Sequence, residues 1–275
     1  MLRAVLFGAG QYGKVLCELL DRKKYTVIGF LDNHLSGSAV CGFPVYHPDN
    51  LPEIGADCVM LALKGDDRRA DARKQIEPFG VPVILPPLDQ IDLRAALTRR
   101  LSRQIRNRNI IGCVAELGVY QGEFAALLNG LFPERRLYLF DTFCGFPPED
   151  ICREKDGASP PIDEFKDTQI STVLERLPYP ENAVIIEGRF PGSAANIDAG
   201  FAFVSLDADL YLPTYEGLRW FYPRLNPGGV ILVHDAESGR FPGAGKALRQ
   251  FCEEERVFPV PLCDLHGSAL VTRSL

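Results

Sequence analysis

The sequence predicts an α/β protein with two Rossmann-like units, each built around a mainly parallel sheet. Three observations support this prediction: short apolar runs alternate with amphipathic stretches, one such run in each half leads into a glycine-containing turn, and an arginine-rich segment separates the halves. Strands that alternate with helices are typical of parallel sheets with helical crossovers. The length of 275 residues also favours two domains over one.

The first series opens with a strand, a glycine turn and a helix. The run AVLF precedes GAGQYG and the helical stretch KVLCELLDRK, and the runs YTVIGFLD, DCVMLAL and VPVILP predict further buried strands. We expect this small nucleotide- or nucleotide-sugar-binding-type domain to span residues 1–88.

Residues 89–109 predict an amphipathic connecting helix, because Leu or Ile recurs every fourth residue from Leu93 to Ile105. The helix carries six Arg, and this charge is compatible with RNA binding. A solvated helix face or an interdomain contact fits an acidic protein better.

The second series, residues 110–275, predicts a seven-stranded domain that resembles the Rossmann-like class I methyltransferases. The expected strands are 111–117, 137–141, 183–187, 201–207, 230–234, 257–262 and 269–272. The last two are joined only by CDLHG, which is too short for a parallel crossover, so they should pair antiparallel.

Composition and charge disfavour several classes of partner. The net charge of −6 and the pI of about 5.4 argue against a nucleic acid held by phosphate attraction. Glycines interrupt the N-terminal apolar run too early for a signal peptide or a membrane span, so no membrane partner is expected. The eight Cys are scattered without a C-x-x-C pair, which indicates reduced thiols in a cytoplasmic protein.

The glycine turn of the second series indicates a cofactor site. In VAELGVYQGEF, Glu116 lies at the strand end, Gly118 permits a sharp turn, and Gly122 lets the helix start close to a ligand. Asp141 ends the next strand, roughly 20 residues or more beyond the turn, where an acid can accept hydrogen bonds from ribose hydroxyls. Many α/β turns contain two glycines, so this pattern alone is also compatible with a purely structural turn.

Paired polar residues follow two later strands. Asp207 and Asp209 come after FVSL, and His234 and Asp235 come after GVILV. Because neighbouring parallel strands end along the same sheet edge, Asp207, His234 and Asp235 are expected to converge beside the cofactor cleft as metal ligands. Carboxylates suit Mg²⁺, and a histidine nitrogen admits Mn²⁺ or another softer metal. The alternatives are a helix cap at Asp235 and a hydrogen-bonded strand-end histidine.

Both members of the D-x-D pair are candidate catalytic residues. Asp207 would hold the cation that activates a hydroxyl group. Asp209 is the candidate general base, with cation binding or a loop-holding role as alternatives.

The second series resembles the macrocin, mycinamicin and novobiocin type of sugar O-methyltransferases, the TylF/MycF family. The resemblance covers roughly residues 111–255 and is carried by AELGVYQGEFA, YLFDTFCGFPPED, EGRFPGSA, VSLDADLY, YPRLNPGGVILVHDAE and GAGKALRQFCEE. It implies S-adenosylmethionine-dependent methylation of a sugar hydroxyl on a glycan, nucleotide sugar or glycosylated metabolite. It also implies that Glu116, Gly118 and Asp141 contact the cofactor, with Thr142 and Phe143 near its adenosine.

The family places a divalent metal on the first Asp of the D-x-D and on an Asp-Asp pair after the next strand. Here His234 stands in place of the first Asp of that pair. The resemblance therefore implies a metal site but leaves the identity of the metal open.

The glycine turn of the first series predicts a second ligand site. AVLFGAGQYGKVL has the strand–GxGxxG–helix context, in which Gly8, Gly10 and Gly13 let backbone amides approach a diphosphate, and Asp32 ends the next strand. Residues 2–86 resemble the N-terminal modules of bacterial glycan-synthesis enzymes, including sugar acetyltransferases that bind a UDP-sugar there. The resemblance implies a nucleotide sugar or a dinucleotide, and an empty site kept for docking or dimerisation is the alternative.

Two rival functions are compatible with the same sequence. One is a nucleotide-sugar-binding protein or NAD-dependent oxidoreductase that uses the first domain, although no Tyr-x-x-x-Lys pair follows its strands. The other is a non-catalytic adaptor. Because DADLY stands where methyltransferases acting on bases carry Asn/Asp-Pro-Pro-aromatic, we expect a small-molecule or glycan substrate; a homo-oligomer is compatible with the sequence.

Overall fold

The computed structural model describes residues 1–86, 92–154 and 164–274. The chain divides into two compact units, Met1–Leu93 with Cys263–Leu265, and Arg94–Leu262 with His266–Leu275. The predicted domain boundary at residue 88 falls within 87–91, outside the described residues. Among the residues that the structure describes, no helix has the length and apolarity needed to cross a membrane.

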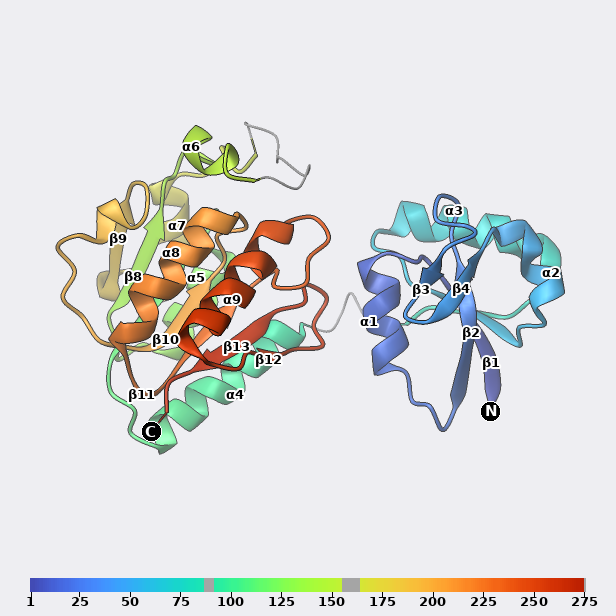
Figure 1. Ribbon diagram of the computed structural model, residues 1–275, viewed down its shortest axis with the longest axis horizontal. Helices are drawn as coiled ribbons and strands as arrows, with labels where there is room; N and C mark the ends of the chain where they lie inside the picture. The colour runs from blue at the N-terminus through green and yellow to red at the C-terminus, as the bar shows by residue number, and fades with distance from the viewer. Residues whose placement is uncertain (87–91, 155–163, 275) are drawn as a thin grey trace. The chain divides into compact units, whose positions relative to one another are not determined.

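The first unit is a six-stranded sheet covered by helices on both faces (Figure 1). Its helices and strands are β1 (Leu2–Phe7), α1 (Gln11–Leu19), β2 (Tyr25–Leu31), β3 (Ala39–Val40), β4 (Phe43–Tyr46), α2 (Leu51–Ile54), β5 (Cys58–Leu61), α3 (Asp66–Ile76) and β6 (Val83–Ile84). The strand order is β3-β4-β2-β1-β5-β6, and every neighbouring pair is parallel except β3 with β4. The chain therefore winds outward from β1 in both directions, as a doubly wound sheet does.

Successive side chains of β1 point to alternate faces of the sheet, so β1 contributes apolar side chains to the cores on both sides. Leu6 belongs to the core on the α1 side, together with Leu16. Phe7 belongs to the core on the opposite side, together with Leu51 of α2 and Ile76 of α3. Successive side chains of a strand point to opposite faces, so a continuous apolar run is required where helices cover both.

The second unit is a seven-stranded, mainly parallel sheet. Its helices and strands are α4 (Leu93–Asn107), β7 (Cys113–Leu117), α5 (Glu123–Leu131), β8 (Leu137–Asp141), α6 (Pro148–Ile151), α7 (Ile170–Arg176), β9 (Ala183–Glu187), β10 (Phe201–Leu206), α8 (Tyr211–Phe221), β11 (Leu225–Val233), α9 (Pro242–Glu255), β12 (Val260–Pro261) and β13 (Ala269–Thr272). The order is β12-β13-β11-β10-β7-β8-β9, and only β13 is antiparallel to its neighbours. The predicted fold class and the antiparallel hairpin at the end are confirmed.

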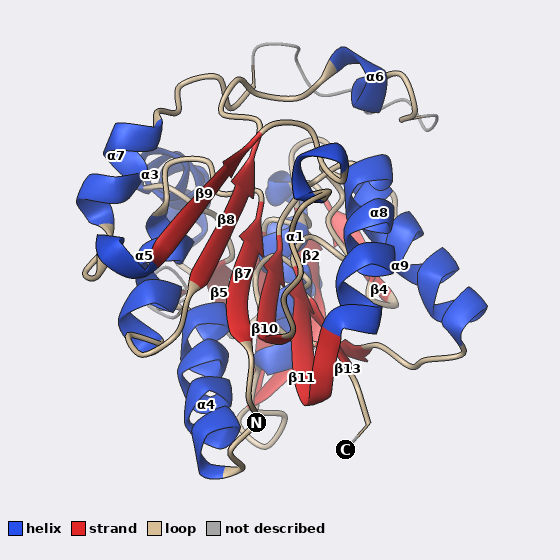
Figure 2. Cartoon of the chain, turned by 90° about the vertical axis from the view of Figure 1, so that its left-hand side faces the viewer, coloured by secondary structure: helices blue, strands red, loops and turns tan. Residues whose placement is uncertain are grey.

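Helices cover both faces of this sheet as well (Figure 2). Phe203 and Leu232 pack on the side of α4, α5 and α7. Val204 and Ile231 pack on the side of α8 and α9. Both faces of the central strands are thus buried.

Several strand ends differ from the prediction: β7 begins at Cys113 and not at 111, β11 ends at Val233 and not at 234, and β12 spans Val260–Pro261 and not 257–262. Two further differences concern the start of β11 and the end of β10. β11 begins at Leu225, earlier than the predicted 230, because Leu225 pairs with Phe201 while Val230 already pairs with Phe203. The intervening Asn-Pro-Gly-Gly forms an irregularity in the register that the apolar pattern did not reveal. β10 ends at Leu206, so Asp207 lies just beyond the strand.

The predicted connecting helix forms and packs into the core of the second unit. Its fully buried side chains include Thr98, Ser102 and Ile105, whereas Leu97 and Leu101 are only partly buried. The leucine stripe therefore packs against the core, as its spacing indicated, and Thr98 and Ser102 are buried beside it. Arg94, one turn before Thr98, reaches Ser205 of the sheet.

Candidate active site

The glycine turn after β7 lies at the point where the chain direction across the sheet reverses, between β7 and β10. Ligands of α/β sheets bind at this position, outside the carboxyl ends of the strands. Gly118 has φ +86°, and a Cβ there would lie 1.9 Å from the carbonyl oxygen of Asp207. Gly118 therefore permits the two strand ends to approach closely. Gly122 has φ +82° and precedes α5, where a Cβ would press on Val173 of α7.

Asp141, at the end of β8, holds this turn through its carboxylate. One oxygen, Oδ2, accepts hydrogen bonds from the backbone N–H groups of Val119 (2.7 Å) and Tyr120 (2.9 Å). The other, Oδ1, accepts from the N–H of Phe143 (2.8 Å). Asp141 thus fixes the loops on which a ribose would lie, and Oδ1 keeps acceptor capacity for a hydroxyl.

Thr142 and Phe143 form the start of the loop after β8. The Thr142 hydroxyl donates to the carbonyl oxygen of Gly145 at 2.6 Å. Phe143 is half-buried against the core beneath and has φ +52°. Both residues therefore lie in the loop that directly follows Asp141.

Glu116 lies inside the second unit with an exposed fraction of 1%, and its Oε2 has no hydrogen-bond partner. Burial raises the pKa of this carboxyl well above its usual range, against the opposing effect of Arg94. An unsatisfied buried carboxyl oxygen is costly unless a ligand donates to it. Glu116 therefore fits the ammonium group of S-adenosylmethionine.

Asp207 is held between two cationic side chains. Its Oδ2 accepts from Nη1 of Arg94 at 3.0 Å, and its Oδ1 lies 2.9 Å from Nδ1 of His234. Burial alone would raise the pKa of Asp207, but Arg94 and His234 outweigh it and keep the pKa well below its usual range. Asp207 is therefore ionised in the folded protein.

His234 lies between two carboxylates. Its Nδ1 is 2.9 Å from Oδ1 of Asp207 and 3.2 Å from Oδ2 of Asp235. Burial lowers the pKa of His234, but these acids outweigh it and raise the pKa to about 9. The two ion pairs keep the ring charged near neutral pH.

Asp209 and Asp235 are crowded beside Asp207. Burial raises the pKa of Asp209 well above its usual range, and the negative charges of Asp207 and Asp235 raise it further. One oxygen from each of the three acids lies within 4.8 Å of the others. Three carboxylate oxygens at this spacing suit a hard divalent cation, and Asp209 retains a proton where no cation relieves the crowding.

Backbone strain gathers at the same edge of the sheet. Tyr120, Phe143, Asp209 and Asp235 follow β7, β8, β10 and β11, and each has φ between +50° and +58°. Left-handed backbone is costly for side chains with a Cβ, and such residues concentrate at functional sites. Each of these four strands thus ends in a strained loop.

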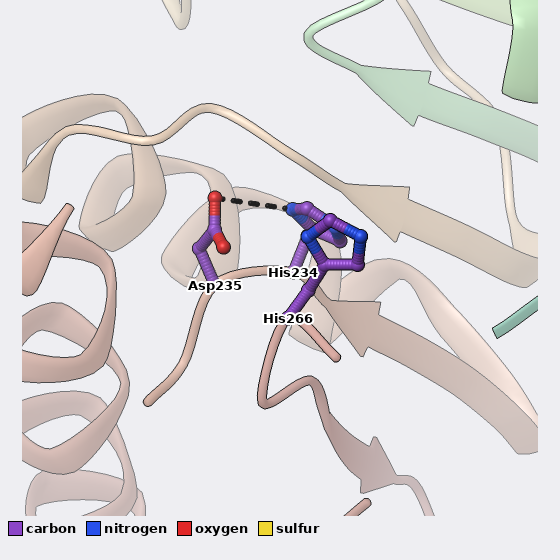
Figure 3. A group of neighbouring side chains, drawn as sticks. All are labelled: His234, Asp235 and His266. Carbon is purple, nitrogen blue, oxygen red and sulfur yellow. Dashed lines mark ion pairs between the residues drawn. The ribbon is translucent and has the colours of Figure 1, made fainter. Parts of the chain in front are cut away.

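Two residues in or beside this cluster, Arg94 and His266, were not predicted. Arg94 donates through Nη2 to the Ser205 hydroxyl at 2.9 Å, and its guanidinium lies 3.8 Å from the ring centre of Phe124. His266, from the loop between β12 and β13, lies against His234 with ring centres 4.5 Å apart (Figure 3). A weak signal existed for Arg94, since Thr98 and Ser102 follow it at helical spacing as small polar residues on one face.

The first unit repeats the glycine turn with an acid. Asp32 at the end of β2 accepts from the N–H of Ala9 at 3.0 Å. A Cβ on Gly8 would lie 2.5 Å from the carbonyl oxygen of Ala62, and one on Gly13 would lie 1.9 Å from that of Gly8. A Cβ on Gly10 would meet no atom within 4 Å. Gly8 and Gly13 are therefore required by packing, whereas Gly10 leaves an open approach to the backbone.

Comparison with known proteins identifies the family of the chain. The profile of the macrocin-O-methyltransferase (TylF) family matches residues 92–273. No curated protein sequence matches the chain.

Two solved structures share the fold. The O-methyltransferase NovP is 18% identical, with a TM-score of 0.57 over 66% of this chain and 80% of that chain. The calicheamicin methyltransferase CalS11 is 20% identical, with a TM-score of 0.54 over 65% of this chain and 78% of that chain.

The family profile covers more than half of the chain and includes every strand of the seven-stranded sheet. We conclude that the chain belongs to the macrocin O-methyltransferase (TylF) family and is an O-methyltransferase whose methyl donor is S-adenosylmethionine.

Proposed function

We propose that this enzyme methylates a sugar hydroxyl of a glycan, nucleotide sugar or glycosylated metabolite, assisted by a divalent cation, Mg²⁺ or Mn²⁺. The observation that carries the proposal is the gathering of the oxygens of Asp207, Asp209 and Asp235 within 4.8 Å of one another. They follow β10 and β11, and Glu116 and the glycine turn belong to the neighbouring β7. A methyl donor and a polar acceptor would therefore meet along one edge.

The residues of the glycine turn would hold the cofactor. S-adenosylmethionine, when bound, supplies an electrophilic methyl group on a sulfonium centre. Oε2 of Glu116 would accept a hydrogen bond from its ammonium group, and Oδ1 of Asp141 would accept one from a ribose hydroxyl. Phe143 and Thr142 would lie beside its adenosine.

Asp209 would receive the proton that the sugar hydroxyl loses. A divalent cation held by Asp207 and Asp235, with His234 in the place of a family carboxylate, would lower the pKa of a coordinated hydroxyl. The same positive charge would lower the pKa of Asp209 and release its proton, which prepares this carboxylate as an acceptor. By holding the cation, Asp207 and Asp235 would position the sugar hydroxyl, which loses the proton, beside Asp209, which accepts it.

The proposal is tested by methyl transfer to a panel of nucleotide sugars and glycosides, with EDTA and with added Mg²⁺ or Mn²⁺. We expect transfer that EDTA abolishes and either ion restores, while calorimetry shows S-adenosylhomocysteine binding in both conditions. Full activity in EDTA would refute the metal assistance. Methylation of phenolic hydroxyls without any sugar product would refute the substrate class.

A second candidate function is nucleotide or nucleotide-sugar binding by the first unit. The open approach to the backbone at Gly10 favours it. Calorimetry with UDP-sugars and NAD tests the idea, and Gly10→Val should abolish binding without disturbing the fold. An absence of binding to the wild-type chain would leave the first unit a role in docking or dimerisation.

The expected partner is accordingly a small molecule or a glycan. The net charge of −6 supports this choice over a nucleic acid.

A further inference from the structure

His266 lies where a further ligand of the metal site would be needed. It is exposed, in the loop between β12 and β13, and its ring faces that of His234 at an interplanar angle of 35° (Figure 3). One ligand atom from each of His234, Asp235 and His266 lies within 4.8 Å of the others. This trio shares Asp235 with the all-carboxylate group, so nitrogen donors adjoin the oxygen donors.

The distances around His234 match those between two ligands of one ion. Its Nδ1 lies 3.2 Å from Oδ2 of Asp235 and 2.9 Å from Oδ1 of Asp207. Ligand bonds of about 2.1 Å at 90–109° separate two donor atoms by about 3.0–3.4 Å. The side chains therefore need little rearrangement, and the exposed ring of His266 can turn toward the ion.

The hydrogen bonding of His234 points the same way. Nδ1 is buried yet has no oriented hydrogen-bond partner, although two carboxylates lie within ion-pair distance. Histidine binds a metal only in its neutral form, so a cation at this position would displace the Nδ1 proton that lies between the two carboxylates. The contact with a second imidazole adds a donor of the same type.

We propose that His234, Asp235 and His266 form a mixed nitrogen–oxygen site that binds a first-row transition ion, such as Mn²⁺, Co²⁺ or Zn²⁺, in preference to Mg²⁺. Imidazole suits these ions, whereas Mg²⁺ prefers oxygen ligands alone. The inference deepens the proposed function by naming the class of metal, and it rests on that function only for the location of the site. Metal binding by these residues is testable whether or not the metal assists methyl transfer.

The test uses Co²⁺ as the probe, since its visible absorption changes when nitrogen ligands bind. Calorimetry of the full chain should show Co²⁺ binding at least about tenfold tighter than Mg²⁺. His266→Ala should weaken Co²⁺ binding by at least about tenfold. A loss of this size is found even for residues that only hydrogen-bond to a metal ligand. The same variant should leave Mg²⁺ binding unchanged, and His234→Asp should shift the preference toward Mg²⁺.

The matched control is His34→Ala, because His34 is an exposed histidine of the first unit. It should bind Co²⁺ as the wild-type chain does, and S-adenosylhomocysteine binding confirms that each variant is folded. Equal Co²⁺ affinity in wild type and His266→Ala, or Mg²⁺ binding as tight as Co²⁺, would overturn the inference. Those outcomes leave sugar methylation untouched, whereas activity in EDTA with intact Co²⁺ binding would contradict only the metal-assisted mechanism.

Discussion

The two units share one construction and differ in what surrounds it. In each unit the first strand leads through a glycine turn into a helix, and an acid ends or directly follows the next strand. Asp32 accepts from the turn amide of Ala9, and Asp141 accepts from those of Val119 and Tyr120. Both units therefore share a hydrogen bond from a backbone N–H of the glycine turn to this acid. The shared hydrogen bond does not by itself identify a catalytic unit.

The difference lies at the neighbouring strand ends. Glu116 stands two residues before Gly118, whereas Leu6 stands two residues before Gly8. β10 leads into Asp207, whereas β5 leads into the apolar Ala62 and Leu63. Within the described ranges, groups of metal-binding side chains occur only in the second unit. Polar residues at the ends of several strands, added to the shared hydrogen bond, therefore distinguish a catalytic site from a binding module.

The largest loss of activity is expected at Asp207, one of the acids that distinguish the second unit from the first. Asp207→Asn keeps the side-chain volume but removes the charge that balances Arg94 and His234 and, in the proposed mechanism, a divalent cation. We expect methyl transfer to fall by about 10²–10³-fold, the scale of losing one electrostatic contact to the reacting centre. The rate with saturating cofactor measures the effect.

The control for this prediction is Asp198→Asn, since Asp198 is an exposed acid shortly before β10. That variant should keep wild-type activity. An Asp207→Asn enzyme as fast as wild type would reduce Asp207 to a loop residue and remove the main distinction between the units.

Arg94→Ala should give the next largest effect, on stability. It leaves the partly buried Asp207 with His234 as its remaining ion-pair partner in the described part of the chain, and removing one member of a buried pair costs about 3–5 kcal/mol. Denaturant unfolding followed by tryptophan fluorescence measures it, because the single Trp of the chain, Trp220, packs in the core of the second unit.

Arg100→Ala, on an exposed face of the same helix, is the matched control and should change the unfolding free energy by less than about 0.5 kcal/mol. If Arg94→Ala unfolds like this control, the guanidinium does not hold the site together.

A smaller effect, on cofactor affinity, should distinguish Asp141 from Asp32. Asp141→Ala should weaken S-adenosylhomocysteine binding by a few kcal/mol at most, since it loses hydrogen bonds to the turn and to the ligand. Asp32→Ala should leave that affinity unchanged, because it belongs to the other unit. Calorimetry of both variants decides between them, and wild-type affinity in Asp141→Ala would remove Asp141 from the cofactor site.

The smallest effect distinguishes the glycines of the first turn. Gly10→Ala should shift the unfolding free energy by less than about 0.5 kcal/mol, because its Cβ meets nothing within 4 Å. Gly13→Ala should destabilise the unit much more, since its Cβ would lie 1.9 Å from the carbonyl oxygen of Gly8. Thermal unfolding by circular dichroism compares them. Equal losses would mean that Gly10 is also required by packing and provides no open approach to a ligand.

Much of the second unit followed from local pattern. The predicted strands 137–141, 183–187 and 269–272 match Leu137–Asp141, Ala183–Glu187 and Ala269–Thr272. Short apolar runs bounded by turn residues define strands well, because both limits are local. The convergence of Asp207, His234 and Asp235 also followed, since parallel strands end along one edge and each residue directly follows its strand.

The sequence by itself determined the α/β class, the two series of strands, the glycine turns and the strand ends that carry acids, because each depends on neighbours within a few residues. Only the tertiary structure brought Arg94 to Asp207, 113 positions away, and placed His266 against His234. Leucine spacing in α4 indicated the side that faces the core but not the burial of Thr98 and Ser102, which depends on packing against a sheet formed by distant segments. Such contacts join segments with no local signal for each other, so folding of the whole sheet decides them.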